Sequence, residues 1–258
     1  MNIAIIFAGG TGQRMGSNVP KQFLNVYGKP IIIHTLEKFQ YHPEIDKIYV
    51  ACKEDLIDYL KKLVKKYNIT KIPRGGIVPG GKTGQDSIFN GLAVAKKNNP
   101  GDSIVLIHDG VRPLIDENLI TRCIENVKKY GSAITCTPAF ETPVISYDGT
   151  NVDELPKRKF VYTAQAPQSF RLDDIYNTHL KVRKENPDYT DIIDSCTLME
   201  LNGFQTHLIE GIRGNIKVTT PEDYLDLLAK LSVEDQKQIF ELFTNREKLN
   251  EFKNVYQK

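Results

Sequence analysis

The chain has 258 residues, of which 40% are hydrophobic and 26% are charged, and its formal net charge at pH 7 is +2. This length suffices for one large α/β domain, with or without an appendage, and the composition is typical of a soluble globular protein. The small net charge does not favour nucleic acid or a membrane surface as a partner, so any cationic site must be a local one.

Cysteine usage and the N-terminal stretch narrow the class further. The four cysteines are scattered without a CxxC pair, which disfavours a metal or redox centre and favours free thiols in a reducing compartment. The first residues contain no charged leader region with a cleavage site, and the apolar run IAIIFA is too short to span a bilayer. We therefore expect a cytoplasmic protein.

Apolar runs and helical patterns alternate along the first half of the chain. The continuous apolar run at residues 2–8 is typical of a central parallel strand covered on both faces. Further strands are expected at 45–52, 77–81, 103–110 and 132–139, and helices at 30–41, 54–67, 85–97 and 116–130. This alternation predicts an α/β fold with a Rossmann-like, mostly parallel sheet and helices on both faces.

The rhythm breaks at about residues 140–168, where a polar hairpin with an Asp-Gly turn and an irregular segment predict a projecting β-arm. A helix at 172–185 and a strand at 204–211 follow, and then a helix that Thr220 caps. Ser232 and Asp235 form a capping-box pattern for a separate last helix. These patterns divide the chain into a main domain at 1–231, which includes the arm, and a helical extension at 232–258.

The glycine-rich loop AGGTGQRMG, directly after the first strand, matches a loose dinucleotide-binding fingerprint through Gly10, Gly12 and Gly16. That fingerprint requires a long helix straight after the turn and an acidic residue at the end of the second strand. Pro20 comes too early for such a helix, and the second strand ends in YVACK without an acid. The loop therefore predicts a phosphate site, but not one for a nicotinamide cofactor.

Residues 76–83 read GIVPGGKT, a literal match to the P-loop pattern. A P-loop needs a buried strand before its first glycine, and the preceding KIPRG is a poor strand. Ile77 and Val78, inside the motif, look like the strand itself. A P-loop phosphotransferase therefore stays as a remote alternative function, as does a nucleotide-binding module without catalysis.

Charged residues, most of them cationic, follow the predicted strands. The first loop supplies Arg14 and Lys21, HDGVRP supplies Asp109 and Arg112, and NIKVT supplies Lys217. Ligands of open α/β sheets bind outside the carboxyl ends of the strands, so these separate segments direct positive charge to one crevice. The predicted ligand is a polyanion.

Five motifs carry a family resemblance: AGGTGQRMGSNVPKQF, GGKTGQDSIFNGL, HDGVRP, AQAPQSF and NIKVTTPEDY, in this order. With them the chain resembles, from about residue 2 to 230, the cytidylyltransferases that activate polyol phosphates. That family includes the 2-C-methyl-D-erythritol 4-phosphate enzyme of isoprenoid synthesis and the ribitol 5-phosphate enzyme of teichoic acid and capsule synthesis. The resemblance implies that CTP and a polyol phosphate give a CDP-polyol and pyrophosphate, with Mg²⁺ as the cofactor.

The acceptor is the open question within this family. HTLEKF, VRP and PQSF resemble the ribitol-type branch, so ribitol 5-phosphate or a similar pentitol phosphate is favoured, with 2-C-methyl-D-erythritol 4-phosphate as the alternative. Three positions depart from the usual family pattern, namely Gly84 in place of an Arg, Ala166 at a Thr position and Gly110 in place of an Ala or Ser. These changes bear on the acceptor more than on the reaction.

The resemblance implies roles residue by residue. Catalytic contacts to the CTP phosphates are expected from Arg14, Lys21 and Lys217. Nucleotide binding is expected from Ala8, Gly9, Gly10, Gly12, Gly80, Gly81, Ser87 and Asp109, with Asp109 near the ribose or as a metal ligand. Acceptor binding is expected from Arg112, Thr142 and Arg158. The last two lie in the arm, which in the family crosses to a second subunit, so a homodimer is also implied.

The remaining histidines are expected to have no catalytic role. His108 is expected to orient the turn at the strand end, because the chemistry needs no general base. His42, His179 and His207 are expected on the surface. Asp191 and Asp194 are candidates either for metal ligands or for helix caps and surface positions.

Overall fold

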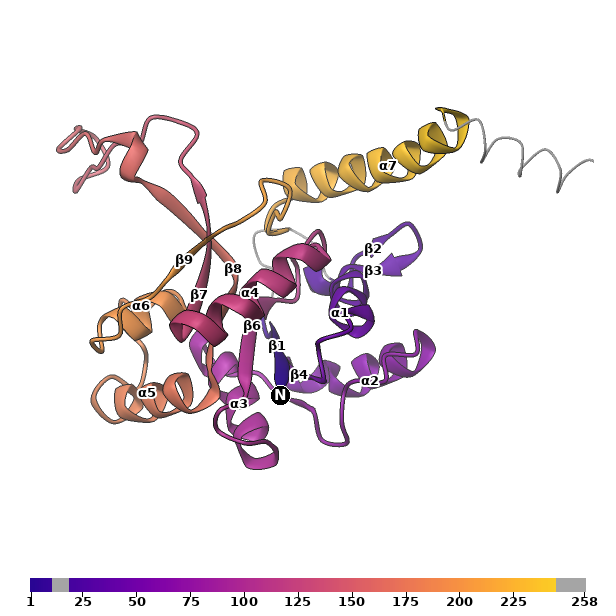
Figure 1. The fold of residues 1–258 in the computed structure, drawn as a ribbon, viewed down its shortest axis with the longest axis horizontal. Helices are drawn as coiled ribbons and strands as arrows, with labels where there is room; N and C mark the ends of the chain where they lie inside the picture. Colours follow the sequence, from indigo (N-terminus) through magenta and orange to yellow (C-terminus); the bar gives the residue numbers. More distant parts are fainter. Residues whose placement is uncertain (11–18, 245–258) are drawn as a thin grey trace, which may run out of the picture.

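The computed structural model describes residues 1–10 and 19–244, and side chains in its last helix up to residue 232 (Figure 1). The strands are β1 (Asn2–Ala8), β2 (Asn25–Val26), β3 (Lys29–Pro30), β4 (Lys47–Cys52), β5 (Ile77–Pro79), β6 (Ile104–Asp109), β7 (Ser132–Pro138), β8 (Tyr162–Arg171) and β9 (Leu208–Glu210). The helices are α1 (Ile31–Tyr41), α2 (Ile57–Lys66), α3 (Gly84–Asn98), α4 (Glu117–Tyr130), α5 (Leu172–Glu185), α6 (Ser195–Glu200) and α7 (Pro221–Thr244). None of these helices is long and apolar enough to cross a membrane.

One sheet of seven strands organises the domain, in the order β5-β4-β1-β6-β8-β7-β9. β1 pairs in parallel with β4 and β6, β4 with β5, and β7 with β9, whereas β8 runs antiparallel to both β6 and β7. The predicted Rossmann-like, mostly parallel sheet is therefore confirmed. The parallel strands β1, β4 and β6 bring their carboxyl ends to one edge, which is where a ligand of such a sheet binds.

The two faces of the sheet carry separate hydrophobic clusters, and β1 contributes to both. Ile3 and Ile5 pack with residues of α3 and α5, whereas Ala4 and Ile6 pack with residues of α1 and α4. All four side chains are fully buried, and each Ile contributes about 1.5–3 kcal/mol by leaving water. Burial on both faces explains why this strand has no polar residue between Ile3 and Ala8.

A smaller cluster anchors the beginning of α7. Val218 and Leu227 pack there with the β2–β3 hairpin and the segment after β6. The Tyr224 hydroxyl donates to the Asn25 carbonyl at 2.6 Å, which adds a polar contact to the same junction. The segment that carries Lys217 is thus held between two packed elements.

α7 continues without a break from Pro221 to Thr244, and Figure 1 shows it extending away from the domain. The separate last helix predicted from Ser232 and Asp235 is therefore wrong, and the boundary drawn at residue 231 falls inside α7. A capping-box pattern begins a new helix only where the residue at the cap position has non-helical geometry, and here the chain stays helical.

The arm leaves the sheet between β7 and β8 and projects from the domain (Figure 1). The described arm residues, 139–161, contain one isolated antiparallel bridge, Ile145 with Glu154, and a short 3₁₀ turn at Arg158–Phe160. Residues 162–168, expected in the arm, instead belong to β8 and pair with β7. Pro167 and the small residues around it obscured this strand pattern, because proline is rare inside strands.

Candidate active site

A cavity of about 330 Å³ opens at the carboxyl edge of β1 and β6. Its walls come from the ends of these strands, the 3₁₀ turn at Lys21–Phe23, the loop before α3 and the segment before α7. The lining residues are Phe7, Ala8, Gly9, Gly10, Lys21, Gln22, Gly81, Lys82, Thr83, Gly84, Ser87, Asp109, Val111 and Lys217. We call this space the first cavity.

Most of the residues predicted to hold the nucleotide meet there. Ala8, Gly9, Gly10, Lys21, Gly81, Ser87, Asp109 and Lys217 all line the first cavity. Gly80 lies just behind it, where its N–H donates to the Cys52 carbonyl at 2.7 Å. Gly12 and Arg14 lie outside the described residues. Four segments far apart in the sequence are therefore brought together, and the roles assigned to their residues stay predictions.

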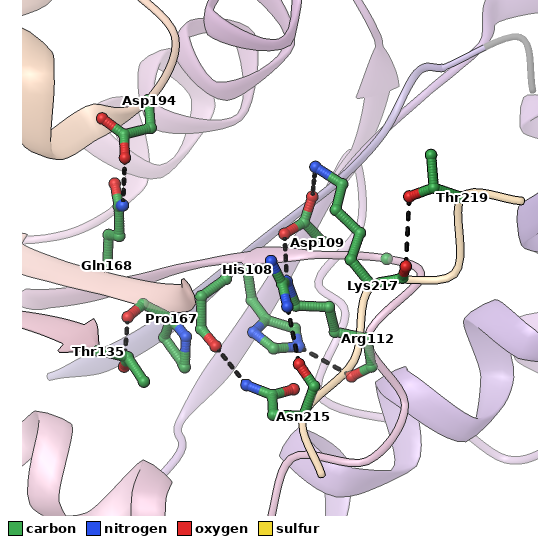
Figure 2. A network of polar contacts seen from close by, with 12 residues as sticks. His108, Asp109, Arg112, Thr135, Pro167, Gln168, Asp194, Asn215, Lys217 and Thr219 are labelled. Atoms are coloured by element: carbon green, nitrogen blue, oxygen red, sulfur yellow. Dashed lines mark hydrogen bonds and ion pairs between the residues drawn. The ribbon is translucent and has the colours of Figure 1, made fainter. Parts of the chain in front are cut away.

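Asp109 forms the charged floor of the site (Figure 2). Its Oδ1 is 2.7 Å from Lys217 Nζ and its Oδ2 is 2.8 Å from Arg112 Nε, while the carboxylate is almost completely buried. Burial alone would raise the pKa of Asp109, but the attraction of Lys217 and Arg112 outweighs it and keeps the pKa below its ordinary value. One negative charge therefore holds two positive charges in place, and the floor keeps a net positive charge.

Arg112 also connects the floor to neighbouring strands. Its Nη1 donates to the Asn215 carbonyl at 2.7 Å, and Asn215 Nδ2 donates to the Ala166 carbonyl at 2.6 Å. Asn215 is fully buried. This chain of contacts ties the end of β6, β8 and the segment before Lys217 into one unit, as Figure 2 shows.

His108 contacts the turn that carries Arg112. Its Nε2 is 3.0 Å from the Arg112 carbonyl, and its ring packs against Phe39. Burial lowers the pKa of His108 to about 4, so the ring is neutral at pH 7. These contacts agree with the predicted orienting role. The surface positions predicted for two other histidines are wrong, because His42 and His179 are buried by tertiary packing.

Gln22 is a site residue that sequence reasoning missed. Its buried side chain donates from Nε2 to the Ala8 carbonyl at 2.8 Å and to the Gly10 carbonyl at 3.2 Å. These bonds hold the start of the glycine-rich loop against the turn that carries Lys21. The only signal in the sequence is a polar residue directly after that lysine, which by itself does not indicate a buried partner.

A second cavity of about 250 Å³ adjoins the first and shares Phe7, Gly84, Asp109 and Lys217 with it. Its other lining residues are Gln85, Ile88, Ile107, Arg112, Ala164, Gln165, Ala166, Gln168, Ile193, Asp194 and Ser195. A Cβ added at Gly84 would meet no atom within 4 Å, so this glycine leaves open space where the two cavities join. Gln85 Oε1 and Ser195 Oγ are buried there without a protein partner.

Metal ligands are sparse in this region. Asp194 caps α6 by accepting from the Thr197 N–H at 2.8 Å, and its other oxygen accepts from Gln168 Nε2, while Asp191 is exposed. Across the described residues no cluster of three or more His, Cys, Asp or Glu side chains is placed to hold a metal ion. Asp109 is the carboxylate that both cavities share.

The two arm residues predicted to bind the acceptor stand apart from both cavities. Thr142 and Arg158 are exposed, and Arg158 Nη1 donates to the Phe140 carbonyl at 3.0 Å within the arm itself. Neither residue lines the first or the second cavity. Within one chain, therefore, Arg112 is the predicted acceptor residue that reaches the site.

The P-loop alternative lacks the structural context that it requires. The strand β5 lies inside the motif, after its first glycine, and Gly75 before it is in a turn with a φ of +77°. The helix does follow, since Thr83 caps α3, but no strand precedes Gly76 in the described segment 67–76. The motif match is therefore accidental.

The comparisons with known proteins agree on one family. The model described as "IspD: 2-C-methyl-D-erythritol 4-phosphate cytidylyltransferase" matches residues 2–234. The chain is 48% identical over 241 residues to the ribitol-5-phosphate cytidylyltransferase of Vibrio parahaemolyticus, covering 93% of this chain and all of that protein. It is 41% identical over 224 residues to the 2-C-methyl-D-erythritol 4-phosphate cytidylyltransferase of Clostridium novyi, covering 86% of this chain and 93% of that protein.

Solved structures give the same result. The 4-diphosphocytidyl-2C-methyl-D-erythritol synthase of Anaerococcus prevotii superposes with a TM-score of 0.75 at 32% identity, covering 90% of this chain and 96% of that one. The cytidylyltransferase of Francisella tularensis superposes with a TM-score of 0.73 at 29% identity, covering 88% of this chain and 99% of that one. The resemblance and the enzyme class expected from the motifs are thus confirmed, and the chain belongs to the 2-C-methyl-D-erythritol 4-phosphate cytidylyltransferase (IspD) family of CTP-dependent nucleotidyltransferases.

Proposed function

We propose that this protein transfers the cytidylyl group of CTP to ribitol 5-phosphate or a similar pentitol phosphate in the cytoplasm, as a precursor step for teichoic acid or capsule synthesis. The observation that carries the choice of acceptor is the pattern of identity. Ribitol-5-phosphate enzymes of Vibrio parahaemolyticus and Streptococcus agalactiae are 48% and 45% identical to this chain along their whole length. The 2-C-methyl-D-erythritol 4-phosphate enzyme of Clostridium novyi is 41% identical over a shorter match.

The first cavity suits the nucleotide, because glycine backbone forms much of its wall. A Cβ on Gly9 would lie 2.8 Å from Ser87 Oγ, and a Cβ on Gly81 would lie 2.0 Å from the Asp86 Cβ. Side chains are therefore excluded at both positions, and main-chain groups are left to approach the ligand. Lys21 and Lys217 add positive charge from opposite segments, as a triphosphate requires.

The second cavity suits a hydroxyl-rich acceptor with one phosphate. Arg112 and Lys217 supply cations for the phosphate. The polar side chains of Gln165, Gln168 and Ser195 line the same cavity, and such a lining suits the hydroxyl groups of a polyol.

The reaction follows from the charge arrangement. An oxygen of the acceptor phosphate attacks the α-phosphorus of CTP, and the new P–O bond forms as the bond to the β-phosphate oxygen breaks. Pyrophosphate leaves with the electron pair. A phosphomonoester loses its second proton near a pKa of about 6, so the nucleophile is already anionic at pH 7 and needs no base. Lys21 and Lys217 stabilise the charge at the reacting phosphorus, and Asp109 and Arg112 hold Lys217 in position.

The residues present fit a Mg²⁺ that arrives with the triphosphate. Mg²⁺ is usually bound through one or two carboxylates together with substrate phosphates, and Asp109 supplies one carboxylate at the junction of the cavities. Each of its oxygens is paired with one cation and keeps a further lone pair. When bound, the ion would neutralise phosphate charge, with Asp109 as its protein ligand.

We further propose a homodimer in which the arm of one chain completes the acceptor site of the other. The arm exposes a row of large apolar side chains, including Val144, Tyr147, Val152, Leu155 and Phe160. Such a surface supports burial against a second copy. Sedimentation of a variant with Leu155→Asp and Phe160→Asp should give a monomer, whereas an unchanged dimer would contradict this assembly.

A two-substrate assay tests the proposed function. Pyrophosphate release from CTP is measured with ribitol 5-phosphate and with 2-C-methyl-D-erythritol 4-phosphate. We expect kcat/KM to be at least about tenfold higher with ribitol 5-phosphate. A higher value with the other substrate would make the chain an isoprenoid-pathway enzyme, and CTP binding without turnover of any acceptor would make it a nucleotide-binding module.

A further inference from the structure

We propose that Arg183, on α5 and outside both cavities, is a positioning residue that holds the nucleotide-facing loop 80–84 in shape by acting through Asp86. The proposal rests on nucleotide binding by the first cavity, which is part of the proposed function. Loop 80–84 supplies four lining residues of that cavity, and none of them forms a hydrogen bond or an ion pair with Arg183. The link is the carboxylate of Asp86 at the start of α3.

One oxygen of Asp86 serves the loop. Asp86 Oδ2 accepts from the Thr83 N–H at 3.2 Å and from the Thr83 hydroxyl at 3.1 Å, and the Asp86 N–H donates to Thr83 Oγ1 at 3.0 Å. This reciprocal pair is a capping box, which satisfies backbone donors at the beginning of a helix. The orientation of the Asp86 carboxylate therefore determines where Thr83 lies.

The other oxygen of Asp86 is bound to α5. Arg183 Nη1 donates to Asp86 Oδ1 at 2.6 Å, and the Asp86 side chain is only 15% exposed. The two oxygens have different partners, so the carboxylate is fixed from both sides. Without Arg183, it would be free to rotate and to exchange Thr83 for water.

Arg183 is itself held rigidly by aromatic rings. The guanidinium carbon lies 4.5 Å from the centre of the Phe89 ring and 5.8 Å from that of Tyr189. The Phe89 ring stacks on Tyr176 at 5.7 Å with an interplanar angle of 3°. Stacking of a planar guanidinium on aromatic faces restricts its rotamers, so Arg183 presents its donors to Asp86 in one geometry.

The loop transmits this geometry to the cavity wall. Gly81 is in such close contact with Asp86 that a Cβ on Gly81 would lie 2.0 Å from the Asp86 Cβ. Ser87 Oγ accepts from the Gly81 N–H at 3.0 Å and donates to the Thr83 carbonyl at 3.0 Å. A shift of the Asp86 carboxylate therefore acts on Thr83 directly and on Gly81 through Ser87 Oγ, and both Gly81 and Thr83 line the first cavity.

The same two helices provide a matched control. Lys96, near the end of α3, forms an ion pair with Asp173, at the start of α5. The Lys96–Asp173 pair joins α3 to α5 as the Arg183–Asp86 pair does, but neither Lys96 nor Asp173 lines the first or the second cavity or forms a hydrogen bond with loop 80–84. A purely structural role predicts similar consequences for the two pairs, whereas a positioning role predicts a difference.

The test compares Arg183→Met, Arg183→Lys and Lys96→Met in the full chain. CTP binding is measured by calorimetry, and the KM for CTP, the KM for the acceptor and kcat are measured by pyrophosphate release. We expect Arg183→Met to weaken CTP binding about tenfold, with an intermediate loss for Arg183→Lys and no change for Lys96→Met. The KM for the acceptor should change less than the KM for CTP.

Several outcomes distinguish a positioning role of Arg183 from a merely structural one. Equal effects of Arg183→Met and Lys96→Met on CTP binding, or no effect of Arg183→Met, would overturn the positioning role. If Arg183→Met does not fold, Arg183→Lys carries the test against Lys96→Met. The double variant Arg183→Met with Thr83→Val should lose no more affinity than Thr83→Val alone, and additive losses would show that Arg183 acts by another route. Absence of CTP binding by the wild-type chain would overturn the proposed function together with this inference.

Discussion

The floor of the site and the arm hold their charged residues in opposite ways. At the floor, Asp109 is buried and binds Lys217 and Arg112 at 2.7 and 2.8 Å, so all three groups are placed by contacts within one chain. In the arm, Thr142 and Arg158 are exposed, and several large apolar side chains of the arm are exposed as well. The comparison sets charged groups that one chain fixes completely against exposed groups that only the proposed homodimer would cover.

The largest expected effect comes from breaking the floor. Asp109→Asn leaves Arg112, which is 13% exposed, and Lys217, which is 42% exposed, without their carboxylate. Because solvent around Lys217 moderates the loss, we expect a cost of about 3 kcal/mol, the lower end of the range for a broken buried pair. The exposed pair of Asp58 with Lys61 is the control, since Asp58→Asn should leave stability nearly unchanged. Urea unfolding measures both values, and equal losses would contradict the contrast between buried and exposed pairs.

Removing one cation from the floor should affect turnover more than folding. Lys217→Met deletes a charge that lines both cavities, and we expect kcat to fall by about 10²–10³, as for the loss of a preorganised group that stabilises transition-state charge. The rate of pyrophosphate release at saturating CTP measures this change in kcat. Lys61→Met, far from the cavities, is the control, and a kcat reduced by less than threefold in Lys217→Met would argue against a catalytic role.

Between about pH 7 and pH 5, acid should weaken the domain more than the arm. Burial, with Arg183 nearby, lowers the pKa of His179 to about 3, and residues 139–161 contain no histidine. Between this value and about 6.5 the unfolded chain binds more protons than the folded one, so stability is lost as pH falls below about 6.5. We expect His179 to account for about 2 kcal/mol of the loss between about pH 7 and pH 5.

The variant His179→Gln tests that share. Glutamine does not titrate and still offers a partner to the Tyr189 hydroxyl, which is 2.8 Å from His179 Nδ1. Chemical unfolding at a series of pH values should give a shallower pH dependence for this variant. Identical slopes for the variant and the wild-type chain would mean that His179 is not kept neutral in the folded state.

The smallest expected effect comes from the arm. Arg158→Ala should raise the KM for the acceptor about tenfold and leave CTP binding and the unfolding free energy of the monomer nearly unchanged, because this exposed side chain bonds within the arm to the Phe140 carbonyl alone among the described residues. Kinetics at varied acceptor concentration provide the measurement. A change in the KM for CTP of the same size would remove the distinction between the two regions.

Local patterns predicted the parts of the fold that depend on neighbouring residues. The run at residues 2–8 became β1 with both faces buried, and the alternation that follows became β4, α3, β6 and α4. The meeting of Lys21, Asp109 and Lys217 at the carboxyl edge of the sheet also followed, although only Asp109 is itself the end of a strand. The motif order was enough to indicate the family.

Contacts between distant segments were not predictable in this way. The placement of β8 between β6 and β7, the burial of His42 and His179, and the short helix α6 each depend on which surface covers the segment. Gln22 and Arg183 have ordinary sequence contexts, and their importance lies in the carbonyl groups and the carboxylate that they meet.

The sequence by itself thus determined the βα order and the family, and it predicted a phosphate site at the first loop, since periodicity, turn residues and motif order are local properties of the chain. Only the tertiary structure decided that Asp109 joins Lys217 to Arg112, and that Asp86 divides its two oxygens between Thr83 and Arg183. A hydrogen bond or an ion pair requires two groups within about 3 Å, and folding alone brings groups a hundred residues apart to that distance.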